Sequence, residues 1–229
     1  MPAGALDQLL ERIDTAAAAS GRPAPRLLAV SKTRTATEVA ELARALQARG
    51  REAAFGENYV QEATDKAAAL QGSGIGWHLV GHLQSNKAAA AADLFEAVQT
   101  VDRPKVVAAL SRHRSPGRPP LDVLVQVNID DEASKHGCRP GDVAALADAI
   151  AGAPRLRLRG LMAIPAPHPD VARRRAAFAR MRALFEATGR DHPGVDTLSM
   201  GMSDDFELAI AEGATMVRIG TALFGARHG

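Results

Sequence analysis

The sequence predicts an α/β protein folded as a single (β/α)8 barrel. Eight short β-branched or leucine-rich segments alternate with longer helical segments over 229 residues. Each return to the same edge of a parallel sheet requires a crossover helix. About 29 residues per unit is close to the lower limit for such a barrel. A doubly wound open sheet is the alternative, and the two ends of the chain favour the barrel over it.

The chain begins with an expected amphipathic helix over Leu6–Ala19. Its apolar residues recur with helical spacing at Leu6, Leu9, Leu10 and Ile13. Acidic residues interrupt this segment, so it lacks the apolar core of an export signal. Only four residues follow Gly225, so we expect no helix after the eighth strand. The N-terminal helix is therefore expected to cover the last strand.

Eight strands and seven intervening helices are predicted after the first helix. The helices include Thr37–Gln47 and Val171–Ala187, each with an apolar face. The predicted strands are Arg26–Thr33, Ala53–Val60, Gly76–Leu83, Phe95–Asp102, Leu121–Ile129, Leu156–Ile164, Asp196–Ser203 and Thr215–Gly225. No linker is seen apart from the segment Ser115–Pro120, and we expect residues 1–229 to form one domain.

The composition argues against several classes of protein. Lys and Arg number 28 against 26 Asp and Glu, a net charge of +2 that gives no reason to expect nucleic-acid binding. The arginine-rich segments 155–159 and 173–175 lack interleaved aromatic residues and are expected to be solvated. No apolar run reaches the roughly 18 residues of a membrane span. The single cysteine, Cys138, is typical of a cytoplasmic protein.

Lys32 is the first candidate for chemistry, because it follows the first strand at the expected working face of the barrel. In an extended strand its side chain would point to the same side as those of Leu28 and Val30. An apolar wall would lower the pKa of the amine and favour a nucleophile able to form a Schiff base with an aldehyde. The alternative is a lysine that simply extends into solvent from the end of the strand.

The loops after the last two strands could hold a phosphate, as in many barrels. Ser199, Ser203, Gly220 and Thr221 offer hydroxyls and backbone N–H groups there. The alternative is that Ser203 or Asp204 only caps the next helix and that Gly220 only turns the chain. A lysine and a phosphate cup on one barrel mouth suggest a phosphorylated aldehyde, and pyridoxal 5′-phosphate (PLP) is the commonest such ligand.

Seven blocks of sequence resemble the pyridoxal phosphate homeostasis protein family of the YggS/PROSC type. They are LLAVSKT, FGENYVQE, WHLVGHLQSNK, VQVNI, LRGLMAIPAP, LSMGMSDDFELAIAEG and TMVRIGTALFGAR, in order between Leu27 and Arg227. The resemblance implies a TIM barrel similar to the N-terminal domain of alanine racemases, with PLP on Lys32. It also implies no established turnover.

The resemblance assigns further roles. Asn58 would line the cofactor ring, and Met162 would form a wall. Arg218 would lie near the pyridine nitrogen and disfavour its protonation, although an ordinary ion pair with an acidic neighbour is the alternative. The phosphate cup would consist of Ser199, Met200, Ser203, Gly220 and Thr221.

Three functions follow as hypotheses. The first is a carrier that buffers PLP or delivers it to PLP-dependent apo-enzymes, with an indirect effect on amino and keto acid balance, and that is expected to be monomeric. The second is a PLP-dependent racemase-like enzyme. Racemization needs a second acid or base on the opposite face of the substrate, and Tyr59 is not assigned that role because strand alternation points it away from the side of Asn58. The third is a cofactor-free aldolase acting on sugar phosphates.

His78 and His82 have the spacing of the first and last histidines of a helical zinc-binding motif. In a strand, however, they would lie about 13 Å apart. No metal site is therefore expected. His82 stands where a proline is frequent in relatives, and it is either a strand-end histidine with its hydrogen bonds satisfied or a ligand contact.

Overall fold

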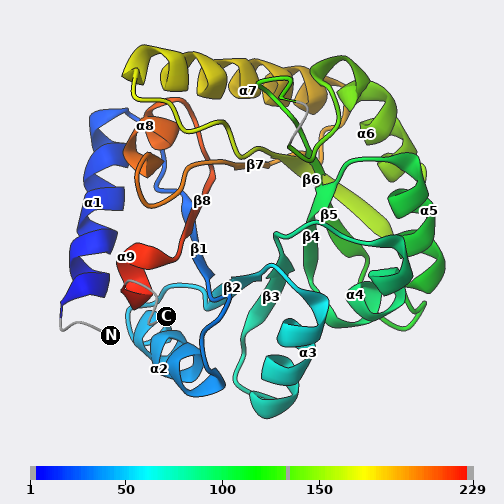
Figure 1. The fold of residues 1–229 in the computed structure, drawn as a ribbon, viewed down its shortest axis with the longest axis horizontal. Helices are drawn as coiled ribbons and strands as arrows, with labels where there is room; N and C mark the ends of the chain where they lie inside the picture. Colours follow the sequence, from blue (N-terminus) through cyan, green and yellow to red (C-terminus); the bar gives the residue numbers. More distant parts are fainter. Residues whose placement is uncertain (1–3, 133–134, 226–229) are drawn as a thin grey trace.

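The computed structural model describes residues 4–132 and 135–225. Ala226 and Arg227, at the end of the last sequence block that carries the family resemblance, lie outside this part. Eight parallel strands pair in chain order, and β8 pairs with β1, so the sheet is a closed barrel (Figure 1). This closure confirms the predicted (β/α)8 barrel and excludes the open sheet. The strands are β1 (Arg26–Val30), β2 (Ala54–Glu57), β3 (Gly76–Leu79), β4 (Ala97–Val101), β5 (Leu121–Gln126), β6 (Leu156–Met162), β7 (Thr197–Ser199) and β8 (Met216–Ile219).

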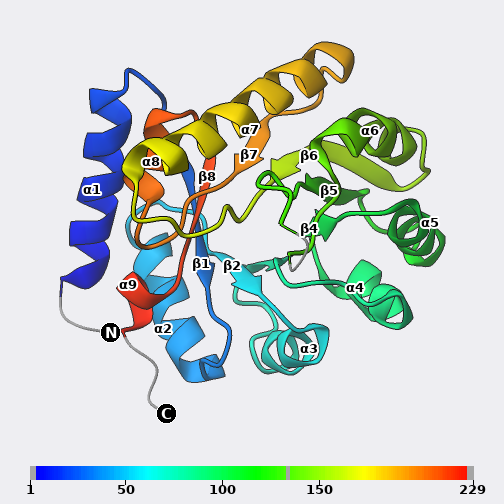
Figure 2. The same ribbon diagram turned by 45° about the horizontal axis from the view of Figure 1, so that its top comes forward.

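Helices surround the barrel on its outside (Figures 1 and 2). They are α1 (Ala5–Ala19), α2 (Ala36–Gln47), α3 (Val60–Ala69), α4 (Ala88–Leu94), α5 (Pro104–His113), α6 (Val143–Ala151), α7 (Val171–Asp191), α8 (Phe206–Ala211) and α9 (Thr221–Phe224). Two short 3-10 helices, Ser85–Lys87 and Pro140–Asp142, precede α4 and α6. Seven helices, α2 to α8, connect successive strands in the described part of the chain, as predicted. No described helix is long and apolar enough to cross a membrane.

All eight predicted strands exist, but each was predicted to continue past its observed end. The first, for example, was expected to reach Thr33 and ends at Val30. The side-chain pattern continues into the residues that follow the strands, and after β1 two of these residues, 32 and 33, form a turn. The prediction that no helix follows the last strand was wrong. The segment up to Gly225, which was expected to be strand, contains the one-turn helix α9.

The N-terminal helix α1 lies where the sequence placed it, at the outer side of the last unit. Its face of Leu6, Leu9, Leu10 and Ile13 is buried. Helix α1 packs against α8 and α9, beside the strands β8 and β1 (Figures 1 and 2). This single helix therefore completes the outer ring between α8 and α2.

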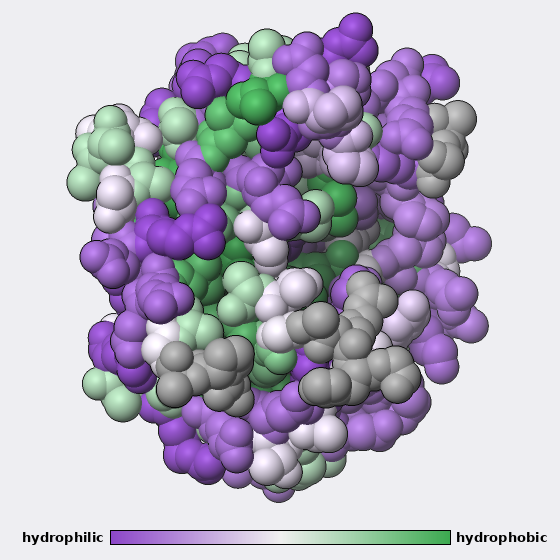
Figure 3. Space-filling view, turned by 60° about the vertical axis from the view of Figure 1, so that its left-hand side comes forward, coloured by the Kyte–Doolittle hydropathy of each residue, from purple (hydrophilic) through white to green (hydrophobic). Residues whose placement is uncertain are grey.

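The main hydrophobic core lies between the barrel and its ring of helices. A second, small cluster of Leu28, Ala54, Val80 and Met216 fills part of the barrel interior. Hydrophilic side chains cover most of the face drawn in Figure 3, and apolar side chains show only in the gaps between them. The remaining interior space holds polar side chains, and these support the site described next.

Candidate ligand site at the carboxyl ends of the strands

A cavity of about 260 Å³ opens among the loops at the carboxyl ends of the strands. It unites residues at or just after the ends of β1, β2, β3, β6, β7 and β8. Its lining consists of Val30, Lys32, Asn58, Val80, Ile164, Met202, Ser203, Asp204, Arg218, Gly220 and Thr221. Six of the nine residues predicted for the site are therefore brought together here. The volume is close to the lower end of the range for small-ligand pockets, about 300–1,000 Å³.

Lys32 lies in the turn immediately after β1 and is half-buried. Val30, two residues earlier, lines the same cavity, and Leu28 lies below it inside the barrel. The three side chains thus point to the same side, as predicted. The apolar wall covers only part of the lysine side chain, and the rest is exposed.

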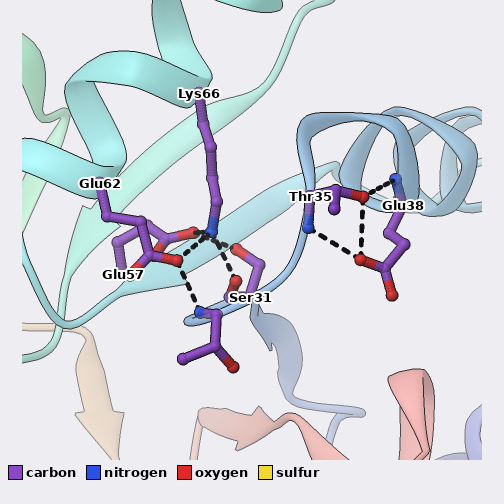
Figure 4. Close-up of polar contacts among 7 residues, drawn as sticks. Ser31, Thr35, Glu38, Glu57, Glu62 and Lys66 are labelled. Carbon is purple, nitrogen blue, oxygen red and sulfur yellow. Dashed lines mark hydrogen bonds and ion pairs between the residues drawn. The ribbon is translucent and has the colours of Figure 1, made fainter. Parts of the chain in front are cut away.

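The backbone on both sides of Lys32 is held by one buried network of charges (Figure 4). The Lys66 ammonium, on α3, donates to the carbonyl oxygen of Ser31 at 2.6 Å. It also donates to Glu57 Oε1 and Glu62 Oε1, each at 2.7 Å. The Ser31 hydroxyl donates to the same oxygen of Glu57 at 2.6 Å. Lys66 therefore ties the residue before Lys32 to β2 and α3.

Thr33 is fixed from the other side of the lysine. Its backbone N–H donates to Glu62 Oε1 at 2.6 Å, and its φ of 64° lies in the left-handed region. A β-branched residue rarely adopts this conformation without support. The bond to Glu62 supplies that support, so the tight turn that directs Lys32 into the mouth depends on a side chain of α3.

Glu57 is fully buried in this network, as is Ser31. Burial raises its pKa, and the hydrogen bonds from Lys66 and Ser31 oppose that shift. Its second oxygen, Oε2, has no hydrogen-bond partner. Removing either partner of such a buried ion pair would leave an uncompensated charge in the interior and destabilise the protein.

Arg218, on β8, presents a buried guanidinium to the cavity. One nitrogen donates to Ser199 Oγ and another to the carbonyl oxygen of Ala163, both at 2.8 Å. Burial lowers its pKa to about 10, so it remains charged at neutral pH. Among the described residues no carboxylate forms a salt bridge with it, so the alternative of an ordinary ion pair was wrong.

A line of hydrogen bonds runs from Arg218 down through the barrel interior. Ser199 Oγ, which accepts from Arg218, donates to Gln99 Oε1 at 2.7 Å. The Gln99 amide nitrogen lies 3.0 Å from His78 Nδ1. His78 is buried and borders a small cavity at the opposite end of the barrel. Together these four residues link the mouth to the bottom of the barrel.

Three predicted site residues do not line the cavity. Ser199 lies beneath it as the support of Arg218. Met162, the last residue of β6, is fully buried. Met200 is fully buried in the outer core. The sequence could not separate these residues from their neighbours, because each lies within three residues of one that lines the cavity.

The loops after β7 and β8 meet at this cavity, as the sequence predicted. Ser203 lies in the first loop, and Gly220 and Thr221 lie in the second. The residue that precedes α8 is Asp205, whose carboxylate accepts from the backbone N–H of Met202 at 2.7 Å. The alternative in which Ser203 or Asp204 caps α8 was therefore wrong.

A second cavity, of about 400 Å³, lies beside the first and shares Asn58 with it. Its lining includes Tyr59, His82 and Lys87. The ring of Tyr59 is on this side, with 65% of the residue exposed, and does not line the cavity of Lys32. Gly81 allows the two loops to meet, because a Cβ there would overlap the backbone of Asn58.

Five residues that line the first cavity were not predicted as site residues. They are Val30, Val80, Ile164, Met202 and Asp204. Val30 was expected only as part of the wall below Lys32, and Asp204 only as a helix cap. Val80 and Ile164 lie in the carboxyl-terminal halves of predicted strands, and this position could have marked them as candidates for the site. Met202 offered no sequence signal, because its role follows from the path of the loop.

The fold and the lysine at its mouth define a class of (β/α)8 barrels typified by alanine racemases. The family model for the N-terminal domain of alanine racemase matches residues 5–228, and the chain belongs to this family. Within it, the chain is 55% identical over 218 residues to the pyridoxal phosphate homeostasis protein of Pseudomonas aeruginosa, covering 94% of this chain and 91% of that protein.

Two further relatives agree with this assignment. The pyridoxal phosphate homeostasis protein of Escherichia coli K12 is 48% identical over 227 residues, with 97% of this chain and 95% of that protein covered. The structure of PipY from Synechococcus elongatus PCC7942 with PLP bound has a TM-score of 0.77 at 36% identity. It covers 95% of this chain and 100% of PipY. The expected family is thereby confirmed.

Proposed function

We propose that this protein holds PLP in the cavity of Lys32 and acts in intracellular PLP homeostasis by buffering or delivering the cofactor. The observation that carries the proposal is that an amine and a buried guanidinium, which forms no salt bridge with any described carboxylate, face one cavity. Lys32 and Arg218 are these two groups. The solved PipY structure with PLP bound and the curated relatives named for PLP homeostasis support it.

The donor groups of the cavity fit the ligand. Bound PLP supplies an aldehyde that reacts with amines and an electron-withdrawing ring. Lys32 Nζ would attach to the aldehyde carbon, and Asn58 would contact the ring. Arg218 would face the ring nitrogen and, being cationic, disfavour its protonation. Ser203, Gly220 and Thr221, which line the cavity beside Lys32, would hold the phosphate.

The first experiment is an absorption spectrum of the purified protein before and after borohydride reduction, followed by mass mapping. We expect a reducible chromophore and a label on Lys32. In Lys32→Ala the chromophore and the label should be lost. Lys87→Ala, which removes an exposed lysine at the neighbouring cavity, is the matched control and should retain both.

The opposite result would be a colourless protein that PLP does not reconstitute. Borohydride trapping of a sugar phosphate on Lys32 in such a protein would point to the aldolase alternative. Unchanged PLP stoichiometry and spectrum in Lys32→Ala would also contradict the proposal, because it would place the cofactor on another group.

We further infer that the bound cofactor is stored and not turned over. Tyr59 is the chain's only tyrosine, and it faces the neighbouring cavity. No tyrosine among the described residues therefore lines the cavity of Lys32 to act as a second acid or base. The test is exchange of the amino-acid α-proton in heavy water. We expect rates no higher than with free PLP, and faster exchange would instead support a racemase-like enzyme.

The proposed recipients are PLP-dependent apo-enzymes in the cytoplasm, the compartment that a single buried cysteine favours. We propose that the carrier is a monomer, because the opening of the cavity of Lys32 would then be accessible to a recipient enzyme. Light scattering at the concentration used for transfer should give the mass of one chain, 24.0 kDa. A stable dimer would contradict this part of the proposal.

A further inference from the structure

Three metal-ligating side chains converge beside the second cavity. They are His82, Asp102 and His136, and their ligand atoms all lie within 4.8 Å of one another. His82 follows β3, Asp102 immediately follows β4, and His136 lies in the segment after β5. Three consecutive strand ends thus bring together residues that are far apart in the sequence.

The separation of these groups exceeds that of a hydrogen bond. His82 Nδ1 and Asp102 Oδ2 are 3.8 Å apart, and direct hydrogen bonds are shorter than about 3.2 Å. Two ligands of one tetrahedral zinc ion, each at about 2.1 Å, lie about 3.4 Å from each other. The two atoms therefore need to approach by only a few tenths of an ångström to share an ion.

The two imidazoles lie face to face, with ring centroids 3.9 Å apart and planes inclined by 16°. Stacked rings cannot both direct a nitrogen lone pair at one ion, so binding requires a rotation about the side-chain torsions. Both residues are exposed. Their rings consequently have room to turn.

The surroundings orient the carboxylate toward the histidines. Arg103 binds Asp102 Oδ1 at 2.5 Å and also donates to the carbonyl oxygen of Leu83 at 3.0 Å. This leaves Oδ2, the atom nearest His82, available to an ion. The Thr100 hydroxyl donates to the carbonyl oxygen of Gly81 at 2.8 Å and so holds the residue before His82. Such outer contacts orient the ligands of protein metal sites.

We propose that His82, Asp102 and His136 form a binding site for a divalent transition-metal ion such as Zn²⁺. Two nitrogens and one oxygen suit zinc, cobalt, nickel or copper better than magnesium or calcium. The remaining coordination positions would hold water or an anion. Because His82 lines the second cavity with Asn58, the ion would add positive charge next to the PLP cavity, which also contains Asn58.

The test is equilibrium dialysis of untagged protein against Zn²⁺, with the bound metal counted by mass spectrometry. We expect about one ion per chain in the wild type. His82→Ala and His136→Ala should each weaken binding at least tenfold. His113→Ala, which removes an exposed histidine on α5, is the matched control and should bind as the wild type does.

Cobalt provides a second readout, since its visible absorption reports nitrogen and oxygen ligands directly. We expect a Co²⁺ band in the wild type and in Lys32→Ala, which separates this site from the proposed PLP site. Loss of the band in His82→Ala, in protein with an unchanged circular dichroism spectrum, would support the assignment. Failure of the wild type to bind one equivalent, or undiminished binding in both histidine variants, would overturn it.

Discussion

At the scale of single residues, Ser199 shows how a side chain outside the cavity can determine what the cavity presents. Its hydroxyl accepts from Arg218 and donates to Gln99. A buried guanidinium that loses an acceptor bears the cost of an unsatisfied polar group, about 1–3 kcal/mol or more for a charged group. Ser199 therefore supports the orientation and charge of Arg218 without lining the cavity.

Ser199→Ala should accordingly lower the free energy of unfolding by about 1–3 kcal/mol and weaken PLP binding. Urea denaturation and PLP titration measure the two effects. Ser115→Ala, at an exposed position, is the control and should change neither. Wild-type values for both in Ser199→Ala would show that Arg218 does not depend on this hydroxyl.

His78 predicts a pH dependence of stability. Burial lowers its pKa from 6.5 to about 4, with a further contribution from Arg26. Between these values the unfolded chain binds more protons than the folded one, so stability falls as the pH falls. The ring shares the lower cavity with the acidic residues Glu52, Glu96 and Asp122.

We expect His78 to account for a loss of about 2 kcal/mol between pH 7.5 and pH 5. The measurement is urea denaturation of the wild type and His78→Gln at both pH values, and the difference between the two proteins isolates the histidine. Glu57 and Glu96, whose pKa values are raised, titrate in both proteins and cancel in that difference. An equal loss in both proteins would contradict the assignment.

At the scale of elements, α3 matters to the site through Lys66 and Glu62, which hold the turn after β1. Removing one partner of a buried ion pair costs about 3–5 kcal/mol. Lys66→Met should therefore destabilise the protein by that amount and reduce the fraction of Lys32 that borohydride traps with PLP. Lys105→Met, at an exposed position on α5, should do neither.

A double variant separates the two effects of Lys66→Met. Adding Glu57→Gln removes the buried carboxylate that the first change leaves unpaired. We expect part of the stability to return while PLP trapping stays low, because the link from Lys66 to Ser31 is still missing. Full PLP trapping in the single variant would show that the turn keeps its shape without Lys66.

Element types were predictable from the sequence, whereas element ends were not. The periodicity of Leu6 to Ile13 was sufficient for α1, because its apolar face is buried as the spacing implied. The ends of the strands depend on backbone hydrogen bonds, and the alternation of side chains in the sequence does not show where these bonds stop. Residues 30–33 continue the pattern of β1, yet the last two of them form a turn.

The same distinction applies to the site. Lys32 and the loops after β7 and β8 follow from strand order, because parallel strands end at one mouth. The network around Lys66 and the group of His82, Asp102 and His136 depend on distances between separate strands. The sequence test for a metal considered only the pair His78 and His82, because the sequence does not show that Asp102 and His136 lie near His82.

At the scale of the whole molecule, α1 closes the ring of helices next to α8 and α9. The loops that carry Ser203, Gly220 and Thr221 lie on this side of the barrel. Ile13 is almost fully buried in that interface. Its role is structural, because no residue of α1 lines the cavity of Lys32.

Ile13→Ala should cost about 2–5 kcal/mol and lower the thermal midpoint by several degrees. The folded variant should still bind one PLP, since the cavity is unchanged. Differential scanning calorimetry and PLP titration provide the two measurements, with the exposed Glu11→Ala as the control. Loss of PLP stoichiometry in folded Ile13→Ala would mean that α1 also shapes the mouth.

The line from Arg218 to His78 has a fixed direction. A guanidinium only donates hydrogen bonds, so Ser199 accepts from Arg218, and it donates to Gln99, whose amide nitrogen lies against His78 Nδ1. An amide nitrogen only donates, so this arrangement pairs with the His78 tautomer that carries its proton on Nε2. The nitrogen resonances of this imidazole consequently provide a spectroscopic reporter, at the closed end of the barrel, of what is bound to Arg218 at the open end.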